Sequence, residues 1–141
     1  MAEELTYLSI AVNDYQYYKD SVKAGFKYNG LIIQGQQFIE KALKAILEIY
    51  DHDKDSDDFK THNIKKLVHT VSRYTTVSNS TDINLSNGYY FDVRYPGKNY
   101  FEPDDSDFES MEIAVDATVV LLRKELSNHN PFIAAAYDMI W

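Results

Sequence analysis

The stretch IIQGQQFIEKALKAIL, residues 32–47, decides the fold of this chain of 141 residues. Apolar side chains recur in it every three or four positions, as on an α-helix with a buried face. They form two neighbouring rows: Leu31, Gly35, Phe38, Ala42, Ala45 and Ile49 in one, and Ile32, Ile39, Leu43 and Ile46 in the other. So wide an apolar face predicts the central helix of a bundle, from about Tyr28 to Tyr50. Glycine in a helix interior costs about 1 kcal/mol relative to alanine, so we expect Gly35 to allow another backbone to approach closely.

The same periodicity predicts further helices on both sides of this stretch. One extends from about Glu4 to Ala24, and another from about Asn63 to Tyr74, where either Thr61 or Asn63 caps the start. The last long helix is expected to begin at a capping box of Ser106 and Glu109. The inner positions of the first helix are Leu8, Ala11, Tyr15, Tyr18 and Val22.

The chain shows no strand alternation and no internal repeat, which predicts an all-α fold: an antiparallel up-and-down helical bundle of four to five helices. We expect residues 1–127 to form the bundle. Residues 128–141 form an apolar tail, expected to be a short helix starting at Asn130-Pro131 and packed on the bundle or on a dimer partner. Residues 75–104 lack a sustained period, so they are expected to be a functional loop or to contain a short helix near residues 83–90.

Composition excludes several classes of protein. There is no cysteine, so disulfides, thiolate metal sites and a cysteine nucleophile are ruled out. The start of the chain does not resemble a signal peptide and no stretch is long and apolar enough for a membrane span, so we expect a cytoplasmic protein. The formal net charge of −8 makes binding of double-stranded DNA unlikely. A local basic patch stays open, because Lys60, Lys65, Lys66 and Arg73 fall in one short segment with His62 and His69.

Three motifs in order resemble the HEPN domain family. The first is residues 32–47, with a Gln-Gln pair followed by Glu-Lys and Lys-Ala. The second is THNIKKLV, residues 61–68, and the third is FDVRYPG, residues 91–97, which contains an Arg-Tyr-Pro turn. The resemblance covers about residues 5–126 and implies a bundle of about five helices that is often dimeric. It also implies nucleotide binding, or a partner nucleotidyltransferase; some members of the family are ribonuclease toxins.

The sequence departs from the ribonuclease pattern of that family. The toxins place a histidine five to seven residues after an arginine, with four to six residues between the two, whereas the corresponding positions after Arg94 are Asn99, Tyr100 and Phe101. Tyrosine, with a reference pKa of about 10, is a poor substitute for histidine in proton transfer at neutral pH. Arg123 and His129 match the spacing but lie at the far end of the last helix. We therefore assign no catalytic residues and lean against an enzyme.

The candidate site is a binding site without metal or cofactor. Gln37, Lys41, Lys44 and Glu48 form a polar stripe that could meet a phosphate; the alternative is a solvated face with Glu40 and Lys44 as an ordinary surface pair. His62 is either a ligand-binding residue or a local cap. Arg94 and Tyr95 either hold a phosphate or tie down the loop. The acidic run at residues 51–58 lacks the glycine and glutamate of a calcium-binding loop.

The leading hypothesis is a non-catalytic HEPN-type module, a homodimer that binds a nucleotide, an RNA phosphate or a partner nucleotidyltransferase in a toxin–antitoxin-like or defence system. One alternative is a divergent metal-independent ribonuclease. The other is a purely structural module for protein interaction.

Overall fold

The computed structural model describes residues 5–87 and 102–141, and all regular structure in those ranges is helical. The long helices are α1 (Thr6–Lys23), α2 (Asn29–Ile49) and α6 (Asp105–His129). The shorter ones are α3 (Ile64–Val71), α4 (Ser80–Asn84) and α7 (Pro131–Tyr137), together with the 3-10 turn η1 (Asp57–Phe59). The prediction of an all-α helical bundle is confirmed. No helix in the described ranges is long and apolar enough to cross a membrane.

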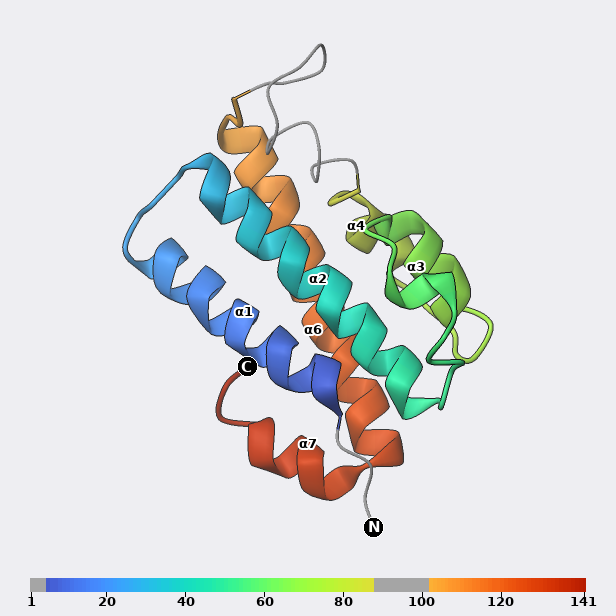
Figure 1. Cartoon of the computed structure of the whole chain (residues 1–141). Helices are drawn as coiled ribbons and strands as arrows, with labels where there is room; N and C mark the ends of the chain where they lie inside the picture. Colours follow the sequence, from blue (N-terminus) through green and yellow to red (C-terminus); the bar gives the residue numbers. More distant parts are fainter. Residues whose placement is uncertain (1–4, 88–101) are drawn as a thin grey trace.

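Helix α2 lies at the centre of the bundle, between α1 on one side and α3 on the other, with α6 packed behind it (Figure 1). Helices α1 and α2 are antiparallel. The pair α2 and α6 instead runs in one direction: Gly35 near the start of α2 faces Met111 near the start of α6, and Tyr50 after α2 bonds Glu125 near the end of α6. This pair departs from the expected alternation because α6 begins at the end of the bundle at which α2 also began.

The core forms along α2, as its two apolar rows predicted. Both rows are almost completely shielded from solvent along most of the helix, and each buried aliphatic side chain contributes roughly 1.5–3 kcal/mol. A Cβ at Gly35 would lie 2.6 Å from Cγ of Met111 and 3.1 Å from the ring of Tyr18. The expected close approach is therefore present, but a methionine side chain occupies the space instead of a backbone.

Two helix starts show how the polar residues set the boundaries. Asn63 caps α3, since its side chain accepts a hydrogen bond from the backbone N–H of Lys66 at 3.0 Å. The capping box predicted at Ser106 is wrong. It lies two residues earlier, where Asp104 and Asp107 accept from each other's backbone N–H groups at 3.1 and 2.9 Å. A carboxylate is as good a cap as a hydroxyl, and here it also meets the positive end of the helix dipole.

The C-terminal tail folds back onto its own chain. Pro131 opens α7 at the first helical turn, and the indole ring of Trp141 lies 5.1 Å from the ring of Tyr15 and 6.4 Å from that of Phe38. Helix α6 continues to His129, so the tail begins beyond its last turn. The side chains of Phe132 and Met139 nevertheless point outward, at 90% and 97% exposure.

Candidate functional site

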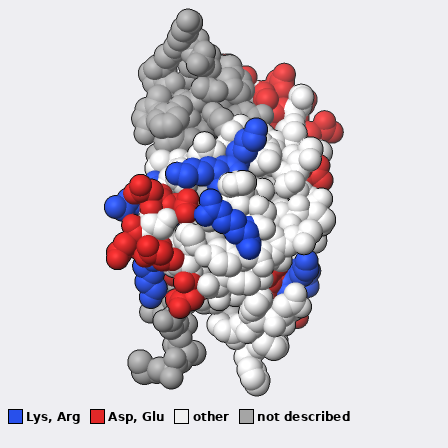
Figure 2. Space-filling model, turned by 90° about the vertical axis from the view of Figure 1, so that its right-hand side faces the viewer, with Lys and Arg blue, Asp and Glu red and all other residues white. Residues whose placement is uncertain are grey.

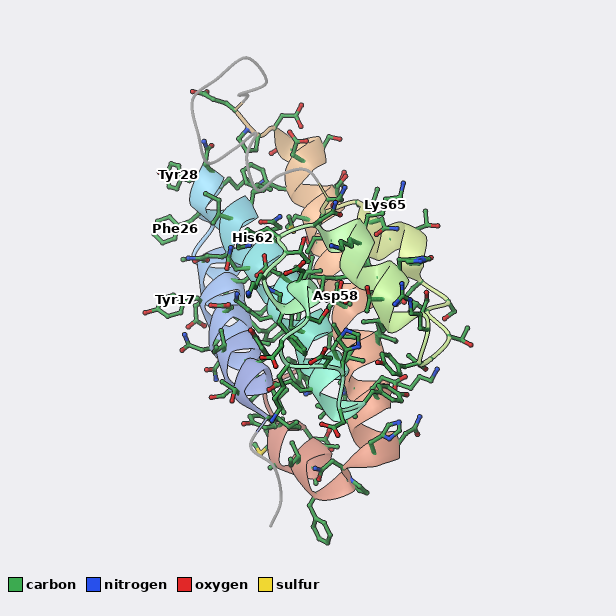
Figure 3. All side chains as sticks on the ribbon, turned by 45° about the vertical axis from the view of Figure 1, so that its right-hand side comes forward. Tyr17, Phe26, Tyr28, Asp58, His62 and Lys65 are labelled. Carbon is green, nitrogen blue, oxygen red and sulfur yellow. The ribbon has the colours of Figure 1, made fainter. Side chains whose placement is uncertain are left out.

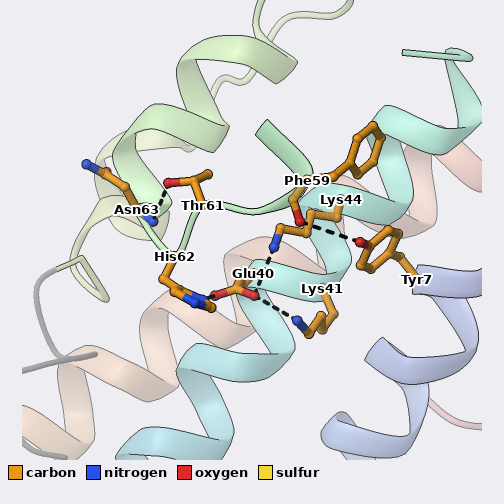
Figure 4. A network of polar contacts seen from close by, with 8 residues as sticks. All are labelled: Tyr7, Glu40, Lys41, Lys44, Phe59, Thr61, His62 and Asn63. Carbon is orange, nitrogen blue, oxygen red and sulfur yellow. Dashed lines mark hydrogen bonds and ion pairs between the residues drawn. The ribbon is translucent and has the colours of Figure 1, made fainter. Parts of the chain in front are cut away.

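A buried carboxylate organises the polar side chains of α2. Glu40 is fully buried, and its Oε2 accepts from Nζ of Lys41 at 2.8 Å and from Nζ of Lys44 at 3.1 Å. Its Oε1 bonds Nδ1 of His62, on the segment before α3, at 2.8 Å (Figure 4). One carboxylate therefore holds three basic side chains from two parts of the chain.

The charges of this network stabilise one another. Burial alone would raise the pKa of Glu40, but hydrogen bonds from Lys41 and His62 and the charge of Lys44 hold that pKa below its ordinary value. Burial lowers the pKa of Lys44, and the attraction of Glu40 opposes this only in part. With one carboxylate and two lysines, the network has a formal net positive charge. Its outer members are Lys41, whose side chain is 20% exposed, and His62, at 42%.

Tyr7 connects the network to a neighbouring cavity. The ammonium groups of Lys41 and Lys44 lie 5.9 and 5.8 Å from the centre of its ring, within the range of cation–π attraction. The same ring stacks on Phe59 of η1, with centroids 5.5 Å apart and planes at 16°. The cavity has a volume of about 350 Å³ and is lined by Thr6, Tyr7, Ile10, Glu48, Lys54 and Phe59.

The predicted site residues divide into three groups. Lys41, Lys44 and His62 are brought together around Glu40. Gln37 is half-buried one turn before Lys41 and lies outside the Glu40 network. Arg94 and Tyr95 lie outside the described residues.

The solvated-face interpretation of the stripe is wrong at its centre. Glu40 and Lys44 do form an i,i+4 pair, but both are buried, with Lys44 only 2% exposed. Sequence reasoning missed the central role of Glu40 and the contribution of Tyr7. The available signal was the row Gln36, Glu40 and Lys44, which are spaced by four within a helix that is otherwise apolar on most sides. Gln36 is also buried, and its carboxamide has no hydrogen-bond partner in the described part of the chain.

The surface around α3 carries charge of both signs. Lys and Arg side chains gather in the middle of the face shown in Figure 2, and Asp and Glu side chains lie directly beside them. Lys60, Lys65, Lys66 and Arg73 are all exposed, as are Asp51, Asp53, Asp55 and Asp57 of the loop after α2. Within the described ranges, no group of three or more His, Asp or Glu side chains is placed to hold a metal ion.

A family model identifies the class of protein to which this bundle and its site belong. The HEPN domain model matches residues 5–125, which is most of the chain. The chain therefore belongs to the HEPN domain family, as the ordered motifs indicated. Neither the curated proteins nor the solved structures include a significant match.

Proposed function

We propose that the protein is a non-catalytic HEPN module that binds a nucleotide or an RNA phosphate group at the Glu40 network. Membership of the HEPN family supports a role connected with nucleotides or RNA. The observation that carries the proposal is the position of Lys41: its ammonium group is held at the edge of the network, between the carboxylate of Glu40 and the ring of Tyr7.

The parts of a nucleotide have separate counterparts in this site. An aromatic wall suits a base, because every base offers a face for stacking. Tyr7 and Phe59 form such a wall in the cavity, and Lys54 lines it as well. A phosphate would meet Lys41 and His62, whose positions are fixed by Glu40 before any ligand arrives. A site organised in advance loses less conformational entropy on binding.

The charge distribution favours a small ligand over a long polyanion. A nucleic-acid strand draws its affinity from an extended basic surface, whereas here exposed aspartates adjoin the lysines of the same face. A mononucleotide needs only a few charge-assisted contacts, each worth roughly 1.5–3 kcal/mol.

The remaining parts of the proposal concern the setting of the site. The histidine expected after Arg94 in a ribonuclease is replaced by Asn99, Tyr100 or Phe101, which supports binding rather than cleavage. The family resemblance supports a cytoplasmic homodimer and a partner nucleotidyltransferase, in a system of toxin–antitoxin or defence type.

Isothermal titration calorimetry with ATP and GTP tests the proposal. Lys41→Gln should weaken binding about tenfold or more, since a lost charge-assisted contact of about 1.4 kcal/mol is tenfold in Kd. Tyr7→Leu should weaken it by a similar factor through loss of the aromatic wall. Lys124→Gln, at an exposed lysine on α6, is the matched control and should leave Kd unchanged.

Two results would overturn the proposal. One is the absence of any heat of binding up to about 1 mM nucleotide, because a Kd of that size corresponds to a binding free energy of only about 4 kcal/mol. The other is binding that Lys41→Gln and Tyr7→Leu do not weaken. Cleavage of a single-stranded RNA by the wild type, lost in Arg94→Ala, would replace the binding role with a ribonuclease.

A further inference from the structure

A second polar cluster lies where the loop after α2 meets the end of α3. His52 bonds the phenol oxygen of Tyr74 through Nδ1 at 2.6 Å and the carboxylate of Asp58 through Nε2 at 2.9 Å. A carboxylate, an imidazole and a hydroxyl thus form one continuous chain, the order in which proteins activate a weak nucleophile.

The hydrogen bonds around Asp58 decide which nitrogen of His52 carries the proton. Burial would raise the pKa of Asp58, but hydrogen bonds from Ser56, His52 and Thr70 outweigh it and hold that pKa below its ordinary value. The ionised carboxylate only accepts, so Nε2 of His52 donates to it. In neutral imidazole, Nδ1 is then the acceptor, and it receives the O–H of Tyr74.

The neighbouring rings leave this hydrogen bond in place and accessible. Tyr50 stacks on Tyr74, with centroids 5.0 Å apart and planes at 18°, but its own hydroxyl donates to Glu125 at 2.6 Å. It therefore does not compete for His52. Tyr74 is 39% exposed, and its bond to His52 lies at the surface.

We propose that Tyr74 is an activated phenol that accepts acyl groups from donors with an acidic leaving group, with His52 as its general base. A free phenol, whose pKa is about 10, is almost entirely protonated and a weak nucleophile at neutral pH. As the Tyr74 oxygen forms a bond to the acyl carbon, its proton passes to Nδ1 of His52. The bond from that carbon to the leaving group breaks, the leaving group departs as an anion, and His52 releases the proton to water. The product is an O-acyl tyrosine, formed without any change in oxidation state.

The chain contains internal controls for this reactivity. Tyr17 and Tyr28 are 59% and 70% exposed, more than Tyr74. They project from the side of the molecule that carries α1 and the start of α2, away from Asp58 (Figure 3). Simple accessibility would make these two react first, whereas base activation makes Tyr74 react first.

The test treats the full chain with p-nitrophenyl acetate at neutral pH and measures acetylation at each tyrosine by peptide mass spectrometry. We expect Tyr74 to be acetylated at least about tenfold faster than Tyr28. This factor is smaller than the ~100-fold or more by which general bases accelerate reactions in enzymes. In His52→Gln, this ratio should fall below one. Tyr74→Phe should remove the acetylation at this position while the rates at Tyr17 and Tyr28 stay unchanged.

Asp58 is a positioning residue in this scheme, and two substitutions separate that role from a structural one. Asp58→Asn keeps an oxygen that can accept the proton of Nε2, so it should retain a ratio above one. Asp58→Ala removes the acceptor, so the ratio of Tyr74 to Tyr28 acetylation should fall to one or below. Equal or slower acetylation of Tyr74 than of Tyr28 in the wild type would overturn the proposal, and so would a ratio that survives His52→Gln in a folded protein. The wild-type ratio decides the matter even where a variant fails to fold.

Discussion

Replacing Glu40 by glutamine should destabilise the fold more than any surface change of equal size. The substitution keeps the shape of the side chain but removes the charge that compensates Lys44, which is only 2% exposed. Removing one partner of a buried ion pair costs about 3–5 kcal/mol. Because glutamine retains an acceptor oxygen, we expect about 3 kcal/mol, a large part of a typical total of about 5–15 kcal/mol.

Urea denaturation followed by far-UV circular dichroism measures this loss. For an m-value of about 2 kcal/mol/M, 3 kcal/mol lowers the unfolding midpoint by about 1.5 M. The control is Lys27→Gln, because the pair Lys27–Asp105 has the same N–O distance of 3.1 Å as Lys44–Glu40 but is exposed. Exposed pairs contribute at most about 1 kcal/mol.

A double-mutant cycle tests whether the loss comes from the unpaired lysine. In Glu40→Gln/Lys44→Met the buried charge is gone as well, so the double variant should be more stable than Glu40→Gln alone. A loss below about 1 kcal/mol for Glu40→Gln would refute a buried, paired carboxylate. A double variant no more stable than that single variant would show that the uncompensated Lys44 is not the cause.

The dependence on pH has a definite sign. The pKa of Glu40 is lowered in the folded protein, so the folded state binds fewer protons than the unfolded state in the acidic range. The stabilisation from Glu40 is therefore complete above the unfolded pKa of about 4.3, and it is lost as pH falls through the lower folded pKa. Glu40→Gln should flatten the fall in stability below that pH relative to the wild type.

The remaining predictions concern packing. Gly35→Ala should destabilise by about 1 kcal/mol, since overpacking against Met111 costs about 1–3 kcal/mol and the better helix propensity of alanine returns about 1. Gly30→Ala, with nothing within 4 Å of its new Cβ, should be neutral or stabilising; equal urea midpoints for the two variants would contradict the packing argument. Trp141→Ala should lower stability by about 1–2 kcal/mol through lost contact with the rings of α1 and α2. Met139→Ala, at 97% exposure, should leave the stability unchanged. Thermal unfolding of both variants tests this: equal melting temperatures would show that Trp141 does not attach the tail to the bundle.

Local pattern was sufficient for most of the fold. The apolar rows of α2 specified a central helix, and Asn63 was one of two caps proposed for α3. The start of α6 was misplaced by two residues because aspartate and serine are both good caps, so four polar residues in a row offered several equivalent beginnings. The parallel course of α2 and α6 also escaped prediction, since periodicity identifies a buried face without giving the direction of the neighbour.

The candidate site was predicted in part. Lys41, Lys44 and His62 were named as candidate binding residues, and the structure brings them together around Glu40. One of the two interpretations placed Glu40 on a solvated face, because a charged residue four positions from a lysine commonly forms a surface pair. Its burial depends on the loop after α2, which returns His62 to cover it.

The sequence by itself determined most of the helices and the family. It did so because periodicity, capping and motif order are local properties. Only the tertiary structure decided which charges are buried together. Glu40 meets His62 across 22 positions, and His52 meets Tyr74 across 22 as well. Contacts between residues so far apart depend on how the loop after α2 packs against α3, and side-chain spacing along one helix carries no information about that.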